Sequence, residues 1–211
     1  MFTGIIEDIG TVTSISPLKD GLEMTVRSEK LTHKLQPGDS ISIDGACQTA
    51  IRVVQDTFTF QAVGETLTKS TLGQFKPGRR VNLEPSLTLQ TPLGGHLLQG
   101  HVQGKAKILN WQKRGDNYYL GISIPDQLIK YCVAEGSIAI DGISLTIAEL
   151  LDQSIGISVI PFTVKKTTLQ ARQLGDWVNI ETDIIARYLE QFLQKSKNEG
   201  VSWEKLKDWG Y

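Results

Sequence analysis

The sequence predicts an all-β protein made of two similar barrels in tandem, followed by a C-terminal helix. Three observations predict this fold. The second half of the chain repeats the first, without a gap over residues 40–84 and 137–181. Short alternating runs rich in Val, Ile, Thr and Phe fill each half, and an apolar stripe with helical spacing follows the second half.

The repeat is clearest when residues 40–84 are laid on residues 137–181, an offset of 97. Of these 45 positions 14 are identical, where unrelated sequences of ordinary composition would give roughly three. An offset of 96 places the opening FTGII on LQGHV at residues 98–102. Because Pro and Gly residues punctuate residues 85–95, the boundary falls there. We expect units at residues 1–88 and 89–183 and a helical segment at residues 184–211.

Short antiparallel strands are predicted in each unit. Runs such as GTVTSI, SISIDG and RVNLE alternate in polarity and are separated by turn residues. Strands spaced so closely in a small domain most often close into a barrel or a Greek-key sandwich, because closure removes exposed edges. The sequence IDG, present in both units, is interpreted as an Asp-Gly hairpin turn.

A helix is predicted from residue 184 onward. The apolar stripe consists of Ile184, Ile185, Tyr188, Leu189, Phe192 and Leu193. Two interpretations remain open, since the stripe can pack on the second barrel or form an oligomer contact. Trp203, Leu206 and Trp209 have the spacing of a second, shorter helix.

Composition excludes several classes of protein. The chain of 211 residues has 22 basic and 23 acidic residues and no basic run, which is not typical of nucleic-acid binding. No apolar run reaches the roughly 18–20 residues of a membrane span, so a soluble protein is expected. The two cysteines, without a secretory leader, predict free thiols and a cytoplasmic location.

Comparison of the two copies identifies candidate catalytic residues. His101 has Ile5 as its counterpart, and Asp183 has Ser86. A histidine needed by the scaffold would be expected in both copies, whereas a group that titrates near neutral pH is needed once per reaction centre. Asp183 also stands where an N-cap of the predicted helix is expected, and the two roles are compatible.

Small polar side chains follow the IDG turn in each unit. Cys47 and Thr49 in the first correspond to Ser144 and Thr146 in the second. Residues i and i+2 of a strand share a face, so each pair is presented side by side. A ligand-binding face and an ordinary solvated strand face are both compatible with this pattern.

The remaining histidines carry weaker signals. His96 is compatible with a turn or a core position, and His33, beside Lys34, with the surface. The spacing of His96 and His101, with no Cys, Asp or Glu set nearby, is not typical of a metal site. No metal is expected.

Five segments, MFTGII, DGACQT, GGHLLQGHV, IDGISLT and IPFTVKKTTL, occur in an order that resembles riboflavin synthases of the alpha type over nearly the whole chain. The resemblance implies two six-stranded Greek-key barrels, a homotrimer assembled by the C-terminal helix, and a reaction without metal or cofactor. It also implies that two molecules of 6,7-dimethyl-8-ribityllumazine dismutate to riboflavin and 5-amino-6-(ribitylamino)uracil.

The resemblance further implies site residues. His101 would transfer protons, Ser144 and Thr146 would donate to developing charge or an adduct at C7, and Asp183 would orient or accept a proton. Cys47 would take part in the reaction or line the pocket as a small side chain. The pocket of the N-terminal barrel would use Gly4, Ile5, Ile6, Cys47, Gln48, Thr49, Gln61, Ala62, Val63, Gly64, Glu65 and Thr66. The pocket of the C-terminal barrel would use Gly100, His101, Val102, Ser144, Leu145, Thr146, Ile160, Pro161, Phe162, Thr163, Val164 and Lys165.

Two positions depart from the family pattern, and two rival functions remain. Glu135 stands where the family usually has Lys, which puts any substrate contact there in doubt, and Gln48 replaces the commoner Leu. The nearest rival is a non-enzymatic lumazine or flavin antenna protein, which resembles the same duplicated barrel but loses the histidine pair and the pocket thiol. A flavin barrel of the ferredoxin-reductase type would need an Arg-x-Tyr-Ser signature that is not seen here.

Overall fold

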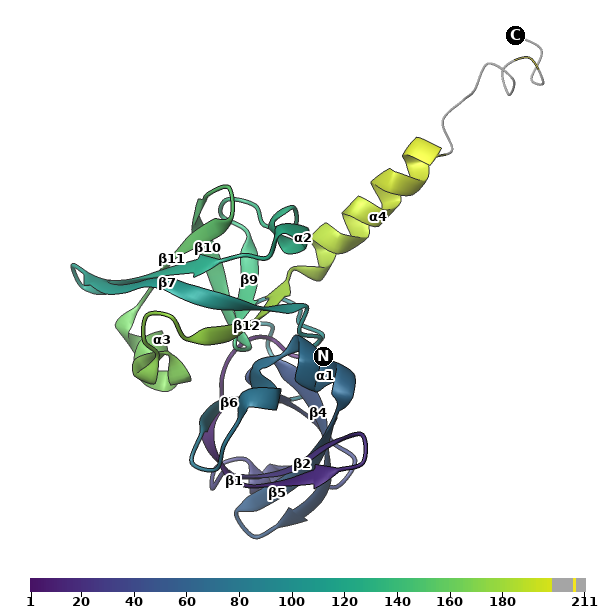
Figure 1. Cartoon of the computed structure of the whole chain (residues 1–211), viewed down its shortest axis with the longest axis vertical. Helices are drawn as coiled ribbons and strands as arrows, with labels where there is room; N and C mark the ends of the chain where they lie inside the picture. The colour runs from purple at the N-terminus through teal and green to yellow at the C-terminus, as the bar shows by residue number, and fades with distance from the viewer. Residues whose placement is uncertain (199–206, 208–211) are drawn as a thin grey trace.

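The computed structural model describes residues 1–198 and residue 207, and it folds into two closed barrels, one above the other in Figure 1. The first barrel has the cyclic strand order β1-β2-β5-β4-β3-β6, and the second repeats this order with β7 to β12. All neighbouring strands are antiparallel. The prediction of two tandem six-stranded antiparallel barrels is confirmed.

The elements follow the same order in both halves. The first barrel contains β1 (Asp8–Leu18), β2 (Gly21–Arg27), η1 (Thr32–Lys34), β3 (Ser40–Ile43), β4 (Ala46–Val54), β5 (Thr57–Val63), α1 (Gly64–Lys69), η2 (Thr71–Gln74) and β6 (Arg80–Pro85). The second contains β7 (Gly104–Arg114), β8 (Asn117–Ser123), α2 (Asp126–Ile129), β9 (Ser137–Ile140), β10 (Ile143–Leu150), β11 (Ser154–Val159), α3 (Pro161–Lys166), η3 (Thr168–Ala171) and β12 (Trp177–Thr182), and α4 (Ile184–Asn198) follows it.

Each barrel encloses its own hydrophobic core, because alternate residues of each strand point inward. In β4, Ala46 and Ala50 are buried, whereas Cys47 is half-buried and Thr49 is exposed. In β10, Ile143 and Ile147 are buried, whereas Ser144 is half-buried and Thr146 is exposed. The strand alternation therefore places both predicted polar pairs on the outer face of their barrels.

The two IDG turns meet back to back at the junction between the barrels. Asp44 and Asp141 have φ values of 43° and 47°, as the predicted Asp-Gly hairpin turns require. A Cβ added to Gly45 would lie 2.7 Å from the backbone nitrogen of Gly142, so glycine is needed for this approach.

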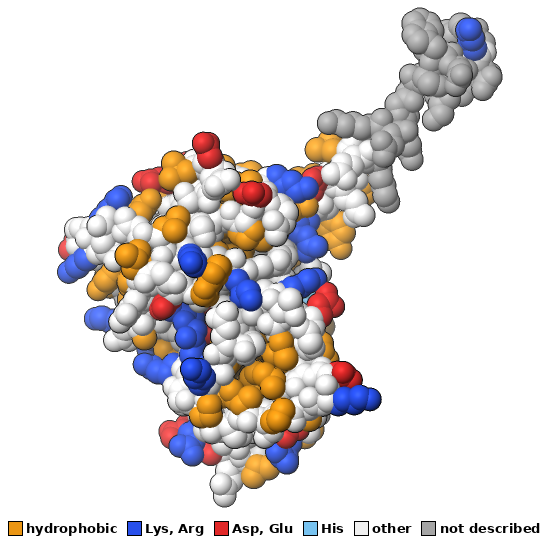
Figure 2. All heavy atoms as spheres, in the orientation of Figure 1, with side chains coloured by type: hydrophobic (Ala, Val, Ile, Leu, Met, Phe, Trp, Pro, Cys, Tyr) orange, Lys and Arg blue, Asp and Glu red, His pale blue; other side chains and the backbone are white. Residues whose placement is uncertain are grey.

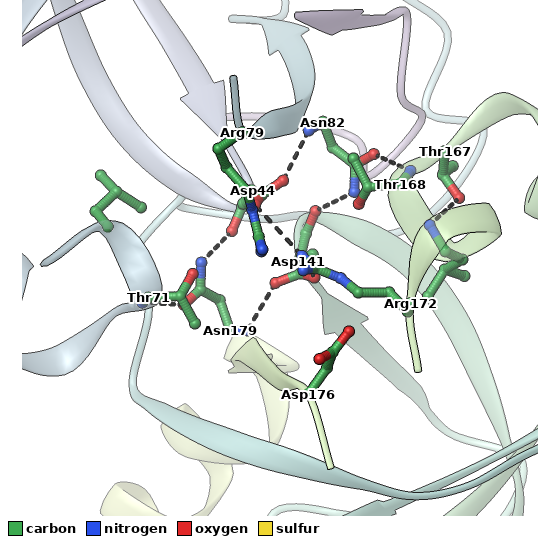
Figure 3. A network of polar contacts seen from close by, with 12 residues as sticks. Asp44, Thr71, Arg79, Asn82, Asp141, Thr167, Thr168, Arg172, Asp176 and Asn179 are labelled. Carbon is green, nitrogen blue, oxygen red and sulfur yellow. Dashed lines mark hydrogen bonds and ion pairs between the residues drawn. The ribbon is translucent and has the colours of Figure 1, made fainter. Parts of the chain in front are cut away.

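Both aspartates of these turns are also fully buried and belong to a polar network that joins the barrels (Figure 3). Asn82 Nδ2 donates to Asp141 O at 3.0 Å, and Asn179 Nδ2 donates to Asp44 O at 2.7 Å. Arg172 Nη2 lies 2.5 Å from Asp141 Oδ2 and 3.5 Å from Asp44 Oδ2. The prediction that IDG forms a hairpin turn is confirmed. The ion pairs between its two aspartates and Arg172 were not predicted from the sequence.

The predicted helix is confirmed as α4, which extends away from the second barrel (Figure 1). Five of the six residues of its apolar stripe are exposed, so the stripe does not pack on the second barrel within the chain. Hydrophobic side chains are visible along α4 in Figure 2, and the exposed members are Ile185, Tyr188, Leu189, Phe192 and Leu193. The second helix predicted at residues 203–209 lies outside the described residues, except for residue 207. No helix in the described part of the chain has the length and hydrophobicity to cross a membrane.

Candidate active site

The segments that lead into β1 and β7 run side by side between the two barrels. Phe2 and Leu98, which correspond at the offset of 96, form an antiparallel bridge. The N–H of Phe2 donates to the carbonyl of Leu98 at 2.8 Å, and the N–H of Leu98 donates to the carbonyl of Phe2 at 3.0 Å. The two halves of the chain are therefore joined through equivalent positions.

Beyond this bridge, each lead-in segment docks on the barrel of the opposite half. Ile6 packs against the core of the second barrel, and Val102 packs against the core of the first. The carbonyl of Gly4 accepts a hydrogen bond from the N–H of Ser144 at 2.9 Å, and the carbonyl of Gly100 accepts one from the N–H of Cys47 at 2.8 Å.

This crossing corrects one expectation from the sequence. The sequence offset groups residues 4–6 with the N-terminal barrel and residues 100–102 with the C-terminal barrel, whereas each segment contacts the other barrel. Residues 4–6 lie beside Ser144 of the second barrel, and residues 100–102 lie beside Cys47 of the first. The sequence offset relates the two copies of a segment, but it does not say which barrel each copy contacts.

Glycine is required at both crossing points. Gly4 and Gly100 have φ values of 78° and 76°, a region that L side chains rarely adopt. A Cβ added to Gly4 would lie 2.5 Å from the Cβ of Ser144, and one added to Gly100 would lie 2.6 Å from the Cβ of Cys47. The absence of a side chain lets the lead-in backbone lie directly against each polar strand.

A cavity of about 380 Å³, which we call the Cys47 cavity, lies where the second lead-in segment meets the first barrel. Its walls come from β4, from α1 and from the lead-in to β7. Its lining residues are Ala46, Cys47, Gln48, Glu65, Thr66, Lys69, Gly100, His101 and Val102. This volume is within the range of small-molecule sites.

A second cavity, of about 610 Å³, lies at the equivalent place in the other half, and we call it the Phe162 cavity. Its lining residues are Ile5, Ile6, Glu7, Asp8, Ile9, Lys30, Arg80, Phe162, Lys165 and Lys166. Four of them, Ile5, Ile6, Phe162 and Lys166, correspond to His101, Val102, Glu65 and Lys69 of the Cys47 cavity. The two cavities therefore share four equivalent positions, although Ser144, the counterpart of Cys47, does not line the Phe162 cavity.

The histidines are distributed differently from the expectation. The sequence groups His101 with Ser144 and Asp183 in one acid–base half. In the structure His101 lines the Cys47 cavity of the other barrel and also a cavity beside Ile184 and Tyr188 of its own half. His96 takes the place beside Ser144, with 2.7 Å between His96 Nδ1 and Ser144 Oγ. Sequence reasoning left His96 as a turn or core residue, and no internal counterpart could reveal it, because its equivalent would precede residue 1.

The buried position of His96 favours its neutral form. The side chain is 8% exposed, and burial lowers the pKa of His96, against the opposing negative charge of Asp183. Among the described residues, His96 Nε2 has no hydrogen-bond partner. A neutral imidazole beside Ser144 can accept the hydroxyl proton at Nδ1 while Nε2 carries the remaining proton.

Asp183 has the capping role that its position predicts. Its Oδ1 accepts a hydrogen bond from the N–H of Ile185 at 2.9 Å, in the first turn of α4. Its negative charge also reaches His96. Asp183 thus links the start of the helix to the Ser144 side of the molecule.

Several site candidates point into the barrel cores rather than outward. The side chains of Ala62, Leu145 and Val164 are buried core members, so only their backbones can face a ligand. Gln48 is buried but lines the Cys47 cavity, and its Nε2 donates to the carbonyl of Cys47 at 2.7 Å. Glu135 is exposed in the turn before β9, with a φ of 62°, and lines neither cavity.

The other candidates lie around the same two regions. Thr49 and Thr146 are exposed beside Cys47 and Ser144 on the outer strand faces. The rest fall at the end of β5 and in α1, or just after β11 and in α3, namely Gln61, Val63, Gly64, Ile160, Pro161 and Thr163.

The chain resembles known proteins over its full length. A family model described as a lumazine binding domain matches twice, at residues 3–86 and 99–183. Riboflavin synthase of Actinobacillus pleuropneumoniae is 34% identical over 100% of both chains. Riboflavin synthase of Mycobacterium tuberculosis is 38% identical over 93% of this chain and 100% of that protein.

Solved structures of LumP have the same fold. LumP complexed with 6,7-dimethyl-8-(1'-D-ribityl) lumazine matches with a TM-score of 0.78 and 27% identity, over 86% of this chain and 99% of that one. LumP complexed with riboflavin matches with a TM-score of 0.80 and 28% identity over the same shares. With two matched domains and full-length relatives of the same name, the chain belongs to the riboflavin synthase family and carries two lumazine binding domains.

Proposed function

We propose that this protein is a riboflavin synthase that converts two molecules of 6,7-dimethyl-8-ribityllumazine to riboflavin and 5-amino-6-(ribitylamino)uracil. One lumazine gives a four-carbon unit to the other. The observation that carries the proposal is the pair of duplication-related cavities, since two identical substrates call for two similar pockets. The full-length riboflavin synthase relatives support the same reaction.

Pairing of the two substrates supplies much of the catalysis in this proposal. Holding two reactants in register converts an encounter of dilute molecules into a reaction within one complex, worth up to about 7–11 kcal/mol in well-oriented cases. The C7 methyl of the lumazine is acidic, because its anion delocalises over the ring. Only modest base assistance is then required, which a histidine can provide.

The Cys47 cavity and the region around Ser144 would divide the chemistry between them. In the Cys47 cavity, His101 would move the proton of the C7 methyl, beside the half-buried Cys47. On the Ser144 side, neutral His96 would accept the hydroxyl proton of Ser144. The Ser144 oxygen could then add to C7 of the second lumazine or stabilise charge that develops there. Thr146 would donate to developing charge, and Asp183 would hold the proton on the imidazole.

A homotrimer in the cytoplasm completes the proposal. The exposed apolar stripe on α4 supports self-association, because soluble monomers rarely expose large contiguous apolar patches. In such an assembly the Cys47 cavity of one subunit would face the Phe162 cavity of the next. Residues 1–88 and 89–183 are the lumazine-binding units of this proposal, and residues 184–211 are its oligomerisation segment.

Incubation of the purified protein with the lumazine alone tests the reaction. We expect riboflavin to form without added metal or cofactor, with two lumazines consumed and one pyrimidinedione released for each riboflavin. Chromatographic quantification of all three compounds against time provides this ratio. Variant His101→Gln serves as the matched reference, because it removes the proton-transfer group and leaves the cavity walls in place.

An antenna protein is the alternative outcome of the same experiment. The similarity to LumP makes it worth testing, but His96, His101 and Cys47 give this chain groups suited to acid–base chemistry. If the protein binds lumazine tightly and leaves it unchanged over many hours, the synthase proposal is wrong and the binding function is supported.

A further inference from the structure

Two buried carboxylates stand at equivalent positions, one at the end of β6 and the other at the end of β12. Glu84 is 3% exposed and Glu181 is 4% exposed. Neither is within ion-pair distance of a Lys, Arg or His side chain in the described part of the chain. Burying a carboxylate is costly unless donors surround it, so their donors indicate what they do.

Each glutamate binds the backbone of a lead-in segment. Glu84 accepts hydrogen bonds from the N–H of Thr3 at 2.6 Å, from Thr3 Oγ1 at 2.7 Å and from the N–H of Gly4 at 3.0 Å. Glu181 accepts them from the N–H groups of Gln99, Gly100 and His101 at 2.7, 3.0 and 3.1 Å. Hydrogen bonds to an ionised acceptor are the stronger kind, so both segments are firmly held.

The held segments are the ones that cross to the opposite barrel. Glu181 belongs to the second barrel, yet the carbonyl of Gly100 that it fixes accepts the N–H of Cys47 in the first. Glu84 belongs to the first barrel, yet the carbonyl of Gly4 accepts the N–H of Ser144 in the second. Each cavity thus depends on a carboxylate from the other half.

The two glutamates differ in what they position. Glu181 also holds the N–H of His101, whereas the N–H of the counterpart Ile5 donates to Thr3 Oγ1 at 3.2 Å. We propose that Glu181 is the positioning residue for His101 and Cys47, and that Glu84 is the positioning residue for the backbone beside Ser144. The catalytic part of this inference rests on the proposed function, but the positioning part does not.

Thiol labelling tests the positioning directly. The two thiols differ, because Cys47 is half-buried in its cavity, whereas Cys132 is buried and burial raises its pKa to about 11. In Glu181→Gln an amide N–H₂ replaces one of the two accepting oxygens and faces at least one backbone N–H, so the segment at residues 99–101 should loosen. We expect a disulfide reagent to modify Cys47 at least about five-fold faster than in the wild type, and Cys132 no faster.

Matched variants provide the controls. Glu84→Gln, which is closer in sequence to Cys47 but holds the other segment, should leave Cys47 labelling unchanged. Glu149→Gln, an exposed change on β10, should do the same. Cys47→Ser identifies the labelled thiol. Equal acceleration in Glu181→Gln and Glu84→Gln, or none in a folded Glu181→Gln protein, overturns the inference.

Turnover separates this inference from the proposed function. If the wild type forms riboflavin, Glu181→Gln should lower kcat about ten-fold or more with KM within about two-fold, because it misplaces a transition-state group. An unchanged kcat overturns the role of Glu181 at His101. If the wild type forms no riboflavin, the proposed function is wrong, but the labelling result still tests the positioning role of Glu181. If Glu181→Gln does not fold, Glu181→Asp keeps the charge but withdraws it from the backbone donors, and should still accelerate Cys47 labelling relative to the wild type. No acceleration in Glu181→Asp contradicts the inference.

Discussion

Asp44 shows at the scale of one residue how duplication creates an electrostatic problem. The two IDG turns bring Asp44 within reach of the negative charge of Asp141, and one buried arginine, Arg172, serves both. The counterpart of Arg172 in the first copy is Phe75, and the first copy instead contributes Arg79, whose Nη2 lies 3.9 Å from Asp44 Oδ2. Burial first, and then repulsion by Asp141, raise the pKa of Asp44 to about 7, although Arg172 and the N–H of Asn82 lower it.

This shift predicts that stability depends on pH. The folded protein holds a proton on Asp44 up to about pH 7, whereas the unfolded chain releases it near the ordinary value of 3.8. Stability from Asp44 is therefore complete below about pH 4 and is lost as pH rises through 7. In Asp44→Asn this decline should disappear from the free energy of unfolding measured by urea titration between pH 4 and 8.

An exposed aspartate provides the control for this measurement. Asp116→Asn lies in the hairpin turn between β7 and β8 and should retain the wild-type pH dependence. If Asp44→Asn declines with pH as steeply as the wild type, Asp44 is not the group that titrates.

A functional residue was predictable where the two copies carry different residue types, but its contacts in the folded protein were less predictable. His101 was found because its counterpart is Ile5. The residues around His101 were not predictable, because the difference between the two copies indicates a specialised group but not its contacts. Glu84 and Glu181 were counted among the identities of the repeat, yet an identical pair is equally compatible with a scaffold role. Only the hydrogen bonds that these carboxylates accept from the backbone distinguish a positioning role from a scaffold role.

At the scale of elements, periodicity predicted the strands and α4, since burial of alternate or one-turn-spaced residues leaves a direct pattern in the sequence. The destination of an element was less predictable. Ile6 and Val102 are both apolar, and either core would accept either side chain, so the exchange of the lead-in segments leaves no pattern. The crossing becomes visible only as contacts in three dimensions.

Helix α4 carries the prediction that belongs to this scale. Its exposed stripe should form the contact between subunits, so Leu189→Glu with Phe192→Glu should place charges in an apolar interface and dissociate the assembly. Light scattering should report three chains of 23.3 kDa for the wild type and one for the double variant at the same concentration.

The matched control adds the same charges to α4 outside the stripe. Gln191→Glu with Gln194→Glu should retain the wild-type mass, because neither residue belongs to the stripe. A monomeric wild type, or a double stripe variant that keeps its mass, would show that α4 does not mediate assembly.

At the scale of the whole molecule, the two barrels are not independent binding units. A chain cut near residue 88 would separate Cys47 from Gly100 and Ser144 from Gly4, so neither half would keep the lead-in segment of the other. The buried network of Asp44, Asp141, Arg172 and the two asparagines fixes the barrels relative to each other. Duplication thus yields two equivalent lead-in segments, each of which contacts the barrel of the opposite half.

The number of ligand sites on each chain tests this account most directly. 8-Ribityllumazine lacks the methyl groups that the reaction requires, so it should bind without turning over. Isothermal titration of the wild type with this compound should give two sites for each chain, as two duplication-related cavities require. A single site for each chain, with the second cavity unable to admit the compound at any concentration, would contradict the account.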